Sequence, residues 1–425
     1  MFEIFLKGSI MENLKTISKE AYTFIKWVFI AVLLGGIGGV VGSFFHMSVD
    51  FATELRTEHD FLIWLLPLGG LVIVFLYKLA HATRGVDTNR VIEAADTDGK
   101  KIPFVMAPLI FVSTVITHLL GGSAGREGAA LQIGGSIGYN LGRLFRLDKK
   151  DMHLIVMTGM SALFAALFGT PVTATFFAVE VVSVGVMHYA GLVPCIISSF
   201  TASHIAKLFG LHPVSFDTVV IPETSADVMW RVVLLSLLCA FVSVAFCLAL
   251  EGAEHVFHKF LKNPYIRIFV GGCVIVALTM LVGTRDYNGA GMDVITAALA
   301  GEARWESFIL KIIFTAITVA AGFKGGEIVP TFFIGSTFGC VVGGLVGLDP
   351  AFGAAIGFVA LFCSVVNCPV ASVMLAIEVF GGEGILIFAA VACVSYMTSG
   401  YTGLYRSQRI VYSKFSENYI NVHTK

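Results

Sequence analysis

GREGAALQIGGSIG, from Gly125 to Gly138, sets an arginine and a glutamate side by side in a glycine-rich segment. An apolar run at residues 104–120 precedes it, and a helix-like segment follows. Ionisable residues at membrane depth are costly, so by default they indicate function. A helix broken within a membrane is tolerated only where protein or a wet cavity surrounds the break. The stretch therefore predicts an interrupted helix inside a membrane protein.

The composition of the whole chain supports this interpretation. Of its 425 residues, 56% are hydrophobic and 13% are charged, whereas soluble domains carry about 25% charged residues. A bilayer needs about 20 apolar residues per helix. Runs that approach this length are 27–45, 61–79, 232–250 and 268–282, with a shorter one at 385–397. We expect an all-α polytopic membrane protein. The net charge of −1 gives no indication of nucleic-acid binding.

Basic residues predict the orientation of the chain. Four lysines precede the first apolar run and three basic residues follow the last, namely Lys7, Lys15, Lys19 and Lys26, and Arg406, Arg409 and Lys414. Under the positive-inside rule both termini are cytoplasmic. The first 26 residues lack the three regions of a signal peptide, and we expect them to form a cytoplasmic N-terminal helix.

The chain contains an internal repeat. SALFAALFGTPVTATFFAVEV, from Ser161 to Val181, aligns without a gap with VALFCSVVNCPVASVMLAIEV, from Val359 to Val379. From Ala162 and Ala360 onward the two share eight identities in twenty positions, including a proline and a glutamate nine residues apart. Interrupted segments at matching positions are typical of secondary transporters, whose substrate sites lie where these segments meet.

The opening motif is also repeated. GREGAALQIGGSIG matches GGEIVPTFFIGSTFG, residues 325–339, with one extra residue in the second copy, so that Glu127 falls on Glu327. The predicted organisation is an N-terminal helix (1–26), a first membrane repeat (27–213), a linker (214–227), a second membrane repeat (228–403), and a C-terminal helix and tail (404–425).

Glycines beside a broken helix predict an anion site. The exposed N–H groups and the dipole of a helix N-terminus favour an anion, and glycine lets the backbone approach it closely. Two such termini would bind an ion without a full positive charge, and a pathway needs an ion that can leave. A carboxylate at Glu127 or Glu327 competes with the anion when charged and carries a proton when neutral. The alternative for each glutamate is a helix cap.

Other residues near these motifs have plainer interpretations. Arg126 is typical of a structural partner for a carboxylate or carbonyl, with contact to the ion as the alternative. Glu180 and Glu378 end matched apolar segments, which favours capping or lining a vestibule over proton transfer. His118 is typical of a buried core histidine. Phe332 and Phe333 are core residues by default, with pathway lining as the alternative.

The motifs resemble those of the CLC family of anion channels and proton-coupled antiporters. GREGAALQIGG is similar to the Gly-Arg/Lys-Glu-Gly-Pro signature of that family, GGEIVP is similar to its Gly-x-Phe-x-Pro element, and TGLYRSQ matches the position of its pore tyrosine. The resemblance runs from about residue 27 to 410. It implies inverted repeats of tilted, broken helices and a homodimer with one pathway per subunit.

The resemblance also implies roles for individual residues. Glu127 would be the gating glutamate, and Glu327 a second proton-handling residue. The implied anion-binding residues are Gly125, Arg126, Gly128, Gly326, Ile328, Val329, Tyr405, Val86, Thr88 and Asn89.

Departures from the family pattern favour one branch. Chloride-handling members carry Gly-Ser-Gly-Ile-Pro where residues 85–89 are Gly-Val-Asp-Thr-Asn, so the serine that faces chloride is replaced by Val86. The internal proton glutamate of chloride antiporters is replaced by Val181, and Glu327 stands where chloride members are apolar. The combination resembles the bacterial branch that exports fluoride in exchange for protons.

These observations define the hypotheses to compare. The first is a fluoride/proton antiporter in the bacterial inner membrane, whose partners are fluoride, protons, the lipid bilayer and a second copy of the chain. The alternative is a chloride channel or chloride/proton antiporter of the same fold. A membrane enzyme or a receptor is disfavoured, because the sequence contains no metal-ligand cluster and no activated nucleophile. We expect no cofactor.

Overall fold

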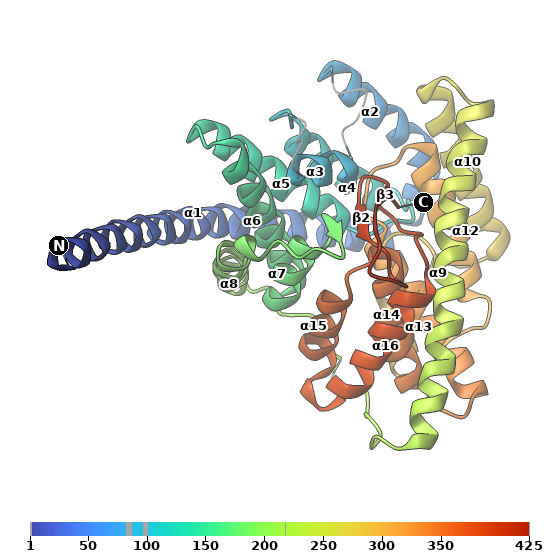
Figure 1. Cartoon of the computed structure of the whole chain (residues 1–425). Coiled ribbons are helices and arrows are strands. Elements are labelled where there is room, and N and C mark those ends of the chain that lie inside the picture. Colours follow the sequence, from blue (N-terminus) through green and yellow to red (C-terminus); the bar gives the residue numbers. More distant parts are fainter. Residues whose placement is uncertain (1, 82–86, 97–100, 217, 425) are drawn as a thin grey trace.

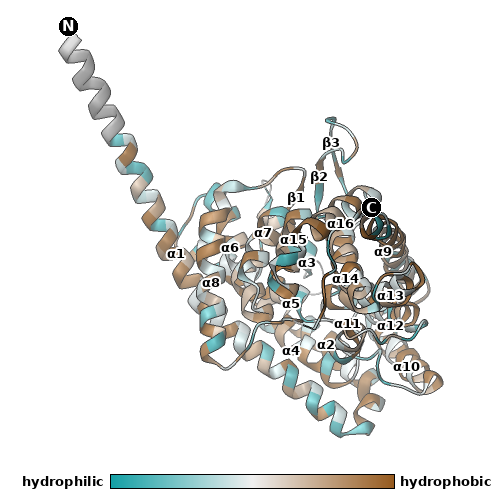
Figure 2. Cartoon of the chain, turned by 90° about the horizontal axis from the view of Figure 1, so that it is seen from below, coloured by the Kyte–Doolittle hydropathy of each residue, from teal (hydrophilic) through white to brown (hydrophobic). Residues whose placement is uncertain are grey.

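A computed structural model describes residues 2–81, 87–96, 101–216 and 218–424. Helices dominate this part of the chain, and the N-terminal part of α1 projects from the body as a long arm (Figure 1). Within the described residues, seven helical segments are long and apolar enough to cross a membrane. Hydrophobic residues, drawn in brown, recur along most of the helices (Figure 2). The chain is therefore a multi-pass membrane protein.

The helices of the first half are α1 (Phe2–Glu58), α2 (Leu66–Leu79), α3 (Thr88–Ala95), α4 (Met106–Leu119), α5 (Glu127–Leu144), α6 (Lys149–Phe168), α7 (Pro171–Glu180) and α8 (Leu192–Leu208). Those of the second half are α9 (Ala226–Phe260), α10 (Pro264–Val282), α11 (Met292–Leu299), α12 (Ser307–Ala321), α13 (Ile328–Leu345), α14 (Pro350–Val366), α15 (Pro369–Phe380) and α16 (Ile385–Thr398). Short 3-10 helices occupy Asp60–Leu65, Tyr189–Gly191 and Gly382–Gly384, and the strands are β1 (Ser183–Val184), β2 (Arg409–Tyr412) and β3 (Tyr419–His423).

All five apolar runs identified in the sequence lie in helices. They fall in α1, in the first 3-10 helix and α2, and in α9, α10 and α16. The N-terminal residues are helical, as expected, but they do not form a separate element. α1 continues without a break from Phe2 to Glu58. The expected N-terminal helix and the first membrane span are therefore one continuous helix.

The repeat is visible as three consecutive helices in each half. α5 and α13 both contain 18 residues, and α7 and α15 both begin with proline as the first helical residue. Proline is favoured there because it lacks the N–H that the first turn leaves unpaired. The order α5–α6–α7 in the first half therefore corresponds to α13–α14–α15 in the second.

Glycines bring the first two helices of each repeat into backbone contact. A Cβ atom on Gly134 of α5 would lie 2.2 Å from the carbonyl oxygen of Gly159 in α6. In the second half, a Cβ atom on Gly335 of α13 would lie 2.3 Å from the carbonyl oxygen of Gly357 in α14. Small residues let membrane helices approach this closely. The predicted glycine spacing thus serves packing within the subunit in both halves.

The two halves cap each other's helices. Glu378, near the end of α15, accepts hydrogen bonds from the N–H groups of Val172 (2.9 Å) and Thr173 (2.8 Å) and from the Thr173 hydroxyl (2.6 Å) at the start of α7. In return Glu180, at the end of α7, accepts the N–H groups of the second and third residues of α15 at 3.2 and 2.8 Å. This reciprocity requires α7 and α15 to run antiparallel, as inverted repeats do.

We expect the Glu378→Ala variant to lose about 3 kcal/mol of stability, because it leaves three donors without their charged acceptor in a poorly hydrated place. Denaturant unfolding of purified protein in detergent measures the loss. Glu383→Ala is the matched control, since Glu383 is an exposed glutamate five residues away and its removal should change stability by less than about 0.5 kcal/mol. Equal unfolding midpoints for the two variants would contradict the capping role.

The C-terminal segment differs from the predicted helix and tail. β2 pairs in parallel with β1, which follows α7, and in antiparallel with β3. The result is a small three-stranded sheet in an otherwise helical protein. The expected C-terminal helix is therefore wrong. RIVY and YINVH are rich in the β-branched and aromatic residues that favour strands, and the strand partner β1 lies more than 200 residues earlier. The fold class is therefore a helical membrane fold with one small sheet at its C-terminal end.

Candidate functional site

The two glycine motifs meet through their backbones. The N–H of Gly125 donates to the carbonyl oxygen of Gly326 at 2.6 Å, and the N–H of Gly326 donates to the carbonyl oxygen of Gly125 at 2.7 Å. This antiparallel bridge lies immediately before α5 and α13. The N-termini of the two helices therefore face each other across one pair of hydrogen bonds, as the sequence predicts for an anion site.

The structure corrects the alignment of the two motifs. Gly134 and Gly335, which make the same interhelix contact, differ by 201 positions, and α5 and α13 begin at residues with the same offset. Glu127 is the first residue of α5, whereas Glu327 precedes α13 as its N-cap. Glu127 thus corresponds to Ile328, and no extra residue is needed. The two glutamates occupy neighbouring positions in the repeat, not equivalent ones.

Glu127 is folded back on the start of its own helix. Its side chain is almost completely buried, and Oε2 accepts a hydrogen bond from the N–H of Arg126 at 3.0 Å. Its other oxygen lies 3.7 Å from Nε of Arg126. A carboxylate in this position occupies the donors at the N-terminus of α5, where an anion would otherwise bind.

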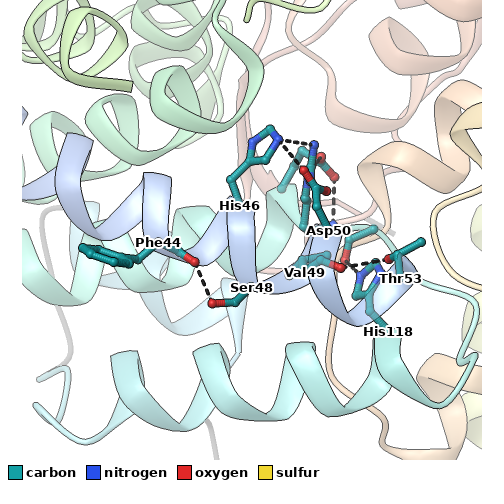
Figure 3. A network of polar contacts seen from close by, with 10 residues as sticks. Phe44, His46, Ser48, Val49, Asp50, Thr53 and His118 are labelled. Atoms are coloured by element: carbon teal, nitrogen blue, oxygen red, sulfur yellow. Dashed lines mark hydrogen bonds and ion pairs between the residues drawn. The ribbon is translucent and has the colours of Figure 1, made fainter. Parts of the chain in front are cut away.

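Arg126 directs its guanidinium group toward α1. Nη1 lies 2.5 Å from Oδ1 of Asp50, and Nη2 lies 3.3 Å from Nε2 of His46. His118 of α4 is buried beside the same turn, with Nε2 3.3 Å from the carbonyl oxygen of Gly125. Figure 3 shows His46, Asp50 and His118 within this network. These contacts support the structural interpretations of Arg126 and His118.

A polar cavity of about 350 Å³ lies on the other side of the motif. It brings together segments that are far apart in the sequence, since α3, α5, α9, α10, the loop before α13 and the loop after α16 all contribute to it. Of the predicted site residues, Thr88, Asn89, Glu327 and Tyr405 line it. Glu327 is partly buried and faces this cavity, while Glu127 does not line it.

Three buried polar atoms of the cavity-lining residues have no hydrogen-bond partner among the described residues. They are the hydroxyl of Tyr405, Oε1 of Gln132 and Nε of Arg267. Buried polar groups are normally paired, so an unpaired hydroxyl beside two helix N-termini fits a donor for a bound ion. Gln132 also donates to Oγ1 of Thr88 at 2.9 Å. The sequence alone does not identify Gln132 as a functional residue. The signal that could have indicated it is a polar amide within a run of small and apolar residues.

The remaining predicted anion-binding residues contribute backbone to the two helix starts. Gly128 lies in the first turn of α5. Ile328 and Val329 open α13, and the first N–H groups of a helix have no acceptor within it. Val86 lies outside the described residues. Phe332 and Phe333 do not line the cavity; both are buried, and Phe332 stacks on Phe358 with ring centres 4.0 Å apart.

The C-terminal sheet holds Tyr405 in place. The hydroxyl of Thr424, just after β3, donates to the carbonyl oxygen of Tyr405 at 2.5 Å. Gln408 donates to the carbonyl oxygens of Val181 (3.1 Å) and Val366 (2.8 Å), which follow α7 and end α14. The segment that carries Tyr405 is therefore tied to both halves of the protein.

The fold and site together are those of a membrane protein of the CLC class, and comparison with known proteins agrees. The chain belongs to the voltage-gated chloride channel (CLC) family, whose model matches residues 68–400. It is 34% identical over 406 residues to a chloride/fluoride channel protein of Pseudomonas syringae pv. tomato, covering 92% of this chain and 87% of the relative.

More distant and structural relatives belong to the same family. An H(+)/Cl(−) exchange transporter of Vibrio vulnificus is 25% identical over 388 residues, covering 83% of this chain and 82% of the relative. The crystal structure of a CLC-type fluoride/proton antiporter superposes with a TM-score of 0.85 at 32% identity, covering 89% of this chain and 96% of that one. The resemblance identified from the sequence motifs is confirmed.

Proposed function

We propose that this protein is a secondary-active antiporter that exports fluoride in exchange for protons across the bacterial inner membrane. It would act as a homodimer with one pathway per subunit and with both termini in the cytoplasm. The observation that carries the proposal is the pair of carboxylates at the meeting point of α5 and α13. Glu127 is buried on one side of the glycine bridge, and Glu327 faces the cavity on the other. Transport needs no covalent chemistry, so the protein is not an enzyme in this proposal.

The donors at this point suit a small, strongly hydrated anion. The first N–H groups of α5 and α13 have no acceptor in their own helices, and the Tyr405 hydroxyl has no partner within the described part of the chain. Fluoride is a strong acceptor, so it needs strong donors to replace its water. A protonated carboxyl group adds an O–H donor that a carboxylate lacks, and bonds from such a donor to an anion are short and strong.

The two glutamates have separate roles in the exchange. Charged Glu127 occupies the N-terminus of α5 and competes with the anion, whereas neutral Glu127 leaves that terminus free and carries a proton. Glu327 meets fluoride in the cavity and provides the second protonatable group. With the C-terminal segment in the cytoplasm, this cavity opens to the cytoplasm, which is the side from which fluoride must be removed.

Relatives support this choice of ion. One relative is named a chloride/fluoride channel protein, and a solved structure at 32% identity is that of a fluoride/proton antiporter. The alternative is chloride transport, by a channel or by proton exchange, as in the relatives named H(+)/Cl(−) exchange transporters at about 25% identity. Glu327 and Val86 favour fluoride, because chloride members carry an apolar residue and a serine at these positions.

A flux assay separates the two functions. Purified protein is placed in liposomes that contain potassium fluoride or potassium chloride, and valinomycin starts the anion efflux. We expect fluoride efflux with proton uptake and little chloride efflux, while protein-free liposomes give the background. Equal rates for the two anions would overturn fluoride selectivity, and efflux without a pH change would overturn proton coupling.

A further inference from the structure

The charged residues at the mouth of the cavity are neutralised by neighbours. Arg406 lies 2.9 Å from a carboxylate oxygen of Glu254 and 3.7 Å from one of Glu251. Arg267 lies 3.1 Å from the ring nitrogens of His258. All five residues line the cavity. These five groups form the rim and nearly cancel one another's charge, and the exposed Asp87 adds a further carboxylate to the lining.

Lys324 is different from the rim residues. It lines the same cavity three residues before Glu327, yet no carboxylate of the described residues lies within salt-bridge distance of its ammonium group. The side chain is partly buried. Partial burial of an ammonium group without an ion-pair partner is unfavourable. The position therefore favours reversible binding of an anion.

The position of Lys324 is fixed from two sides. Its backbone N–H donates to Oγ1 of Thr117 at 3.3 Å, and its ammonium group lies 4.9 Å from the centre of the Tyr77 ring. A cation held against an aromatic face gains electrostatic attraction without losing its N–H donors to a carboxylate. Lys324 therefore holds its ammonium group at a fixed place in the cavity, which Asp87 and Glu327 also line.

The other groups around this charge fit an anion subsite. Glu327 and Tyr405 line the same cavity, and the hydroxyl of Tyr405 is buried and without a partner among the described residues. We propose that Lys324 is an anion-binding residue, which recruits the transported ion from the cytoplasmic cavity before the ion reaches the helix N-termini. This inference rests on the proposed function and adds to it a residue and a step.

An anion subsite at Lys324 would complement the weaker, dipolar donors at the N-termini of α5 and α13. The helix N-termini offer only partial charges, and fluoride at low concentration must first leave bulk water. A full charge in the cavity raises the local anion concentration. Because Lys324 lies beside the pathway and not at the glycine bridge, the ion can move on when Glu327 becomes protonated and donates to it.

The test separates recruitment from structural support. Initial fluoride efflux is measured over a series of fluoride concentrations with wild type, Lys324→Met, Lys324→Arg and Lys78→Met. Lys78 is the matched control, since it is an exposed lysine 5.9 Å from the ring of Tyr265. We expect the half-saturating concentration of Lys324→Met to rise about tenfold at an unchanged maximal rate. Lys324→Arg and Lys78→Met should stay within about twofold of wild type.

Other results would overturn the inference. An unchanged half-saturating concentration in Lys324→Met excludes recruitment, and a loss of maximal rate alone in both Lys324 variants indicates a structural role. If Lys324→Met does not purify as a folded protein, Lys324→Gln replaces it under the same criteria. If wild type moves chloride and not fluoride, the fluoride function fails, and the same comparison with chloride decides the role of Lys324 independently.

Discussion

The Glu127→Gln variant is expected to lose proton movement almost completely. Glutamine has nearly the shape of the protonated side chain, but it neither releases nor binds a proton, and general acid–base groups contribute about 100-fold or more to the steps they serve. Fluoride-driven proton uptake in liposomes should therefore fall at least about 100-fold. Because glutamine does not compete with the anion, any fluoride that still passes should do so without protons.

Glu180→Gln provides the control for this experiment. Glu180 is also a mostly buried carboxyl group at the end of a helix, but its oxygens accept N–H groups of α15. We expect that variant to be less stable and to keep the proton-to-fluoride ratio of wild type. Proton uptake at the wild-type rate in Glu127→Gln would contradict the role given to Glu127.

The Gly357→Ala variant is expected to cost about 3 kcal/mol of stability or more, at the upper end of overpacking effects. A Cβ atom on Gly357 would lie 2.0 Å from the carbonyl oxygen of Gly335, and no side-chain movement relieves a clash with backbone. α13 and α14 must then separate, and α13 carries the donors of Ile328 and Val329. The free energy of unfolding in detergent and the rate of fluoride efflux should both fall.

Gly252→Ala is the matched control. Gly252 lies within α9, and a Cβ atom there meets no atom within 4 Å. In an exposed helix, alanine is preferred to glycine by about 1 kcal/mol, so this variant should be slightly more stable than wild type. If the two alanine variants had equal stability, close helix contact would not be the reason for Gly357.

The sequence predicts the helical repeat well because its signals are local. Apolar runs, the paired prolines Pro171 and Pro369, and the glycine spacings all act within one or two helices. The prediction of a C-terminal helix was wrong because the strand partner of β2 is residues 183–184, far away in the chain. The reciprocal contacts of Glu180 and Glu378 are equally distant. The sequence favours capping or lining a vestibule over proton transfer for both, but nothing local indicates which helix each one caps.

The candidate site was predicted in part for the same reason. The motifs identify Glu127, Glu327 and Tyr405. However, the start of a helix depends on backbone geometry, and matching the two glutamates in the alignment paired Glu127 with Glu327. The structural equivalent of Glu127 is the next residue, Ile328. Gln132 and Lys324 have no distinctive local pattern. They matter because several segments that are distant in the sequence enclose one cavity, and only the folded chain shows which of its charges are paired.

The exchanged helix caps have a consequence for biosynthesis. The acceptor for the first turn of α7 is 205 residues further along the chain, so the ribosome must complete nearly all of the second half before that turn is satisfied. Until Glu378 is synthesised, the N–H groups in the first turn of α7 lack their acceptor. We expect the two halves, produced as separate polypeptides, to accumulate poorly alone and to rescue each other when produced together.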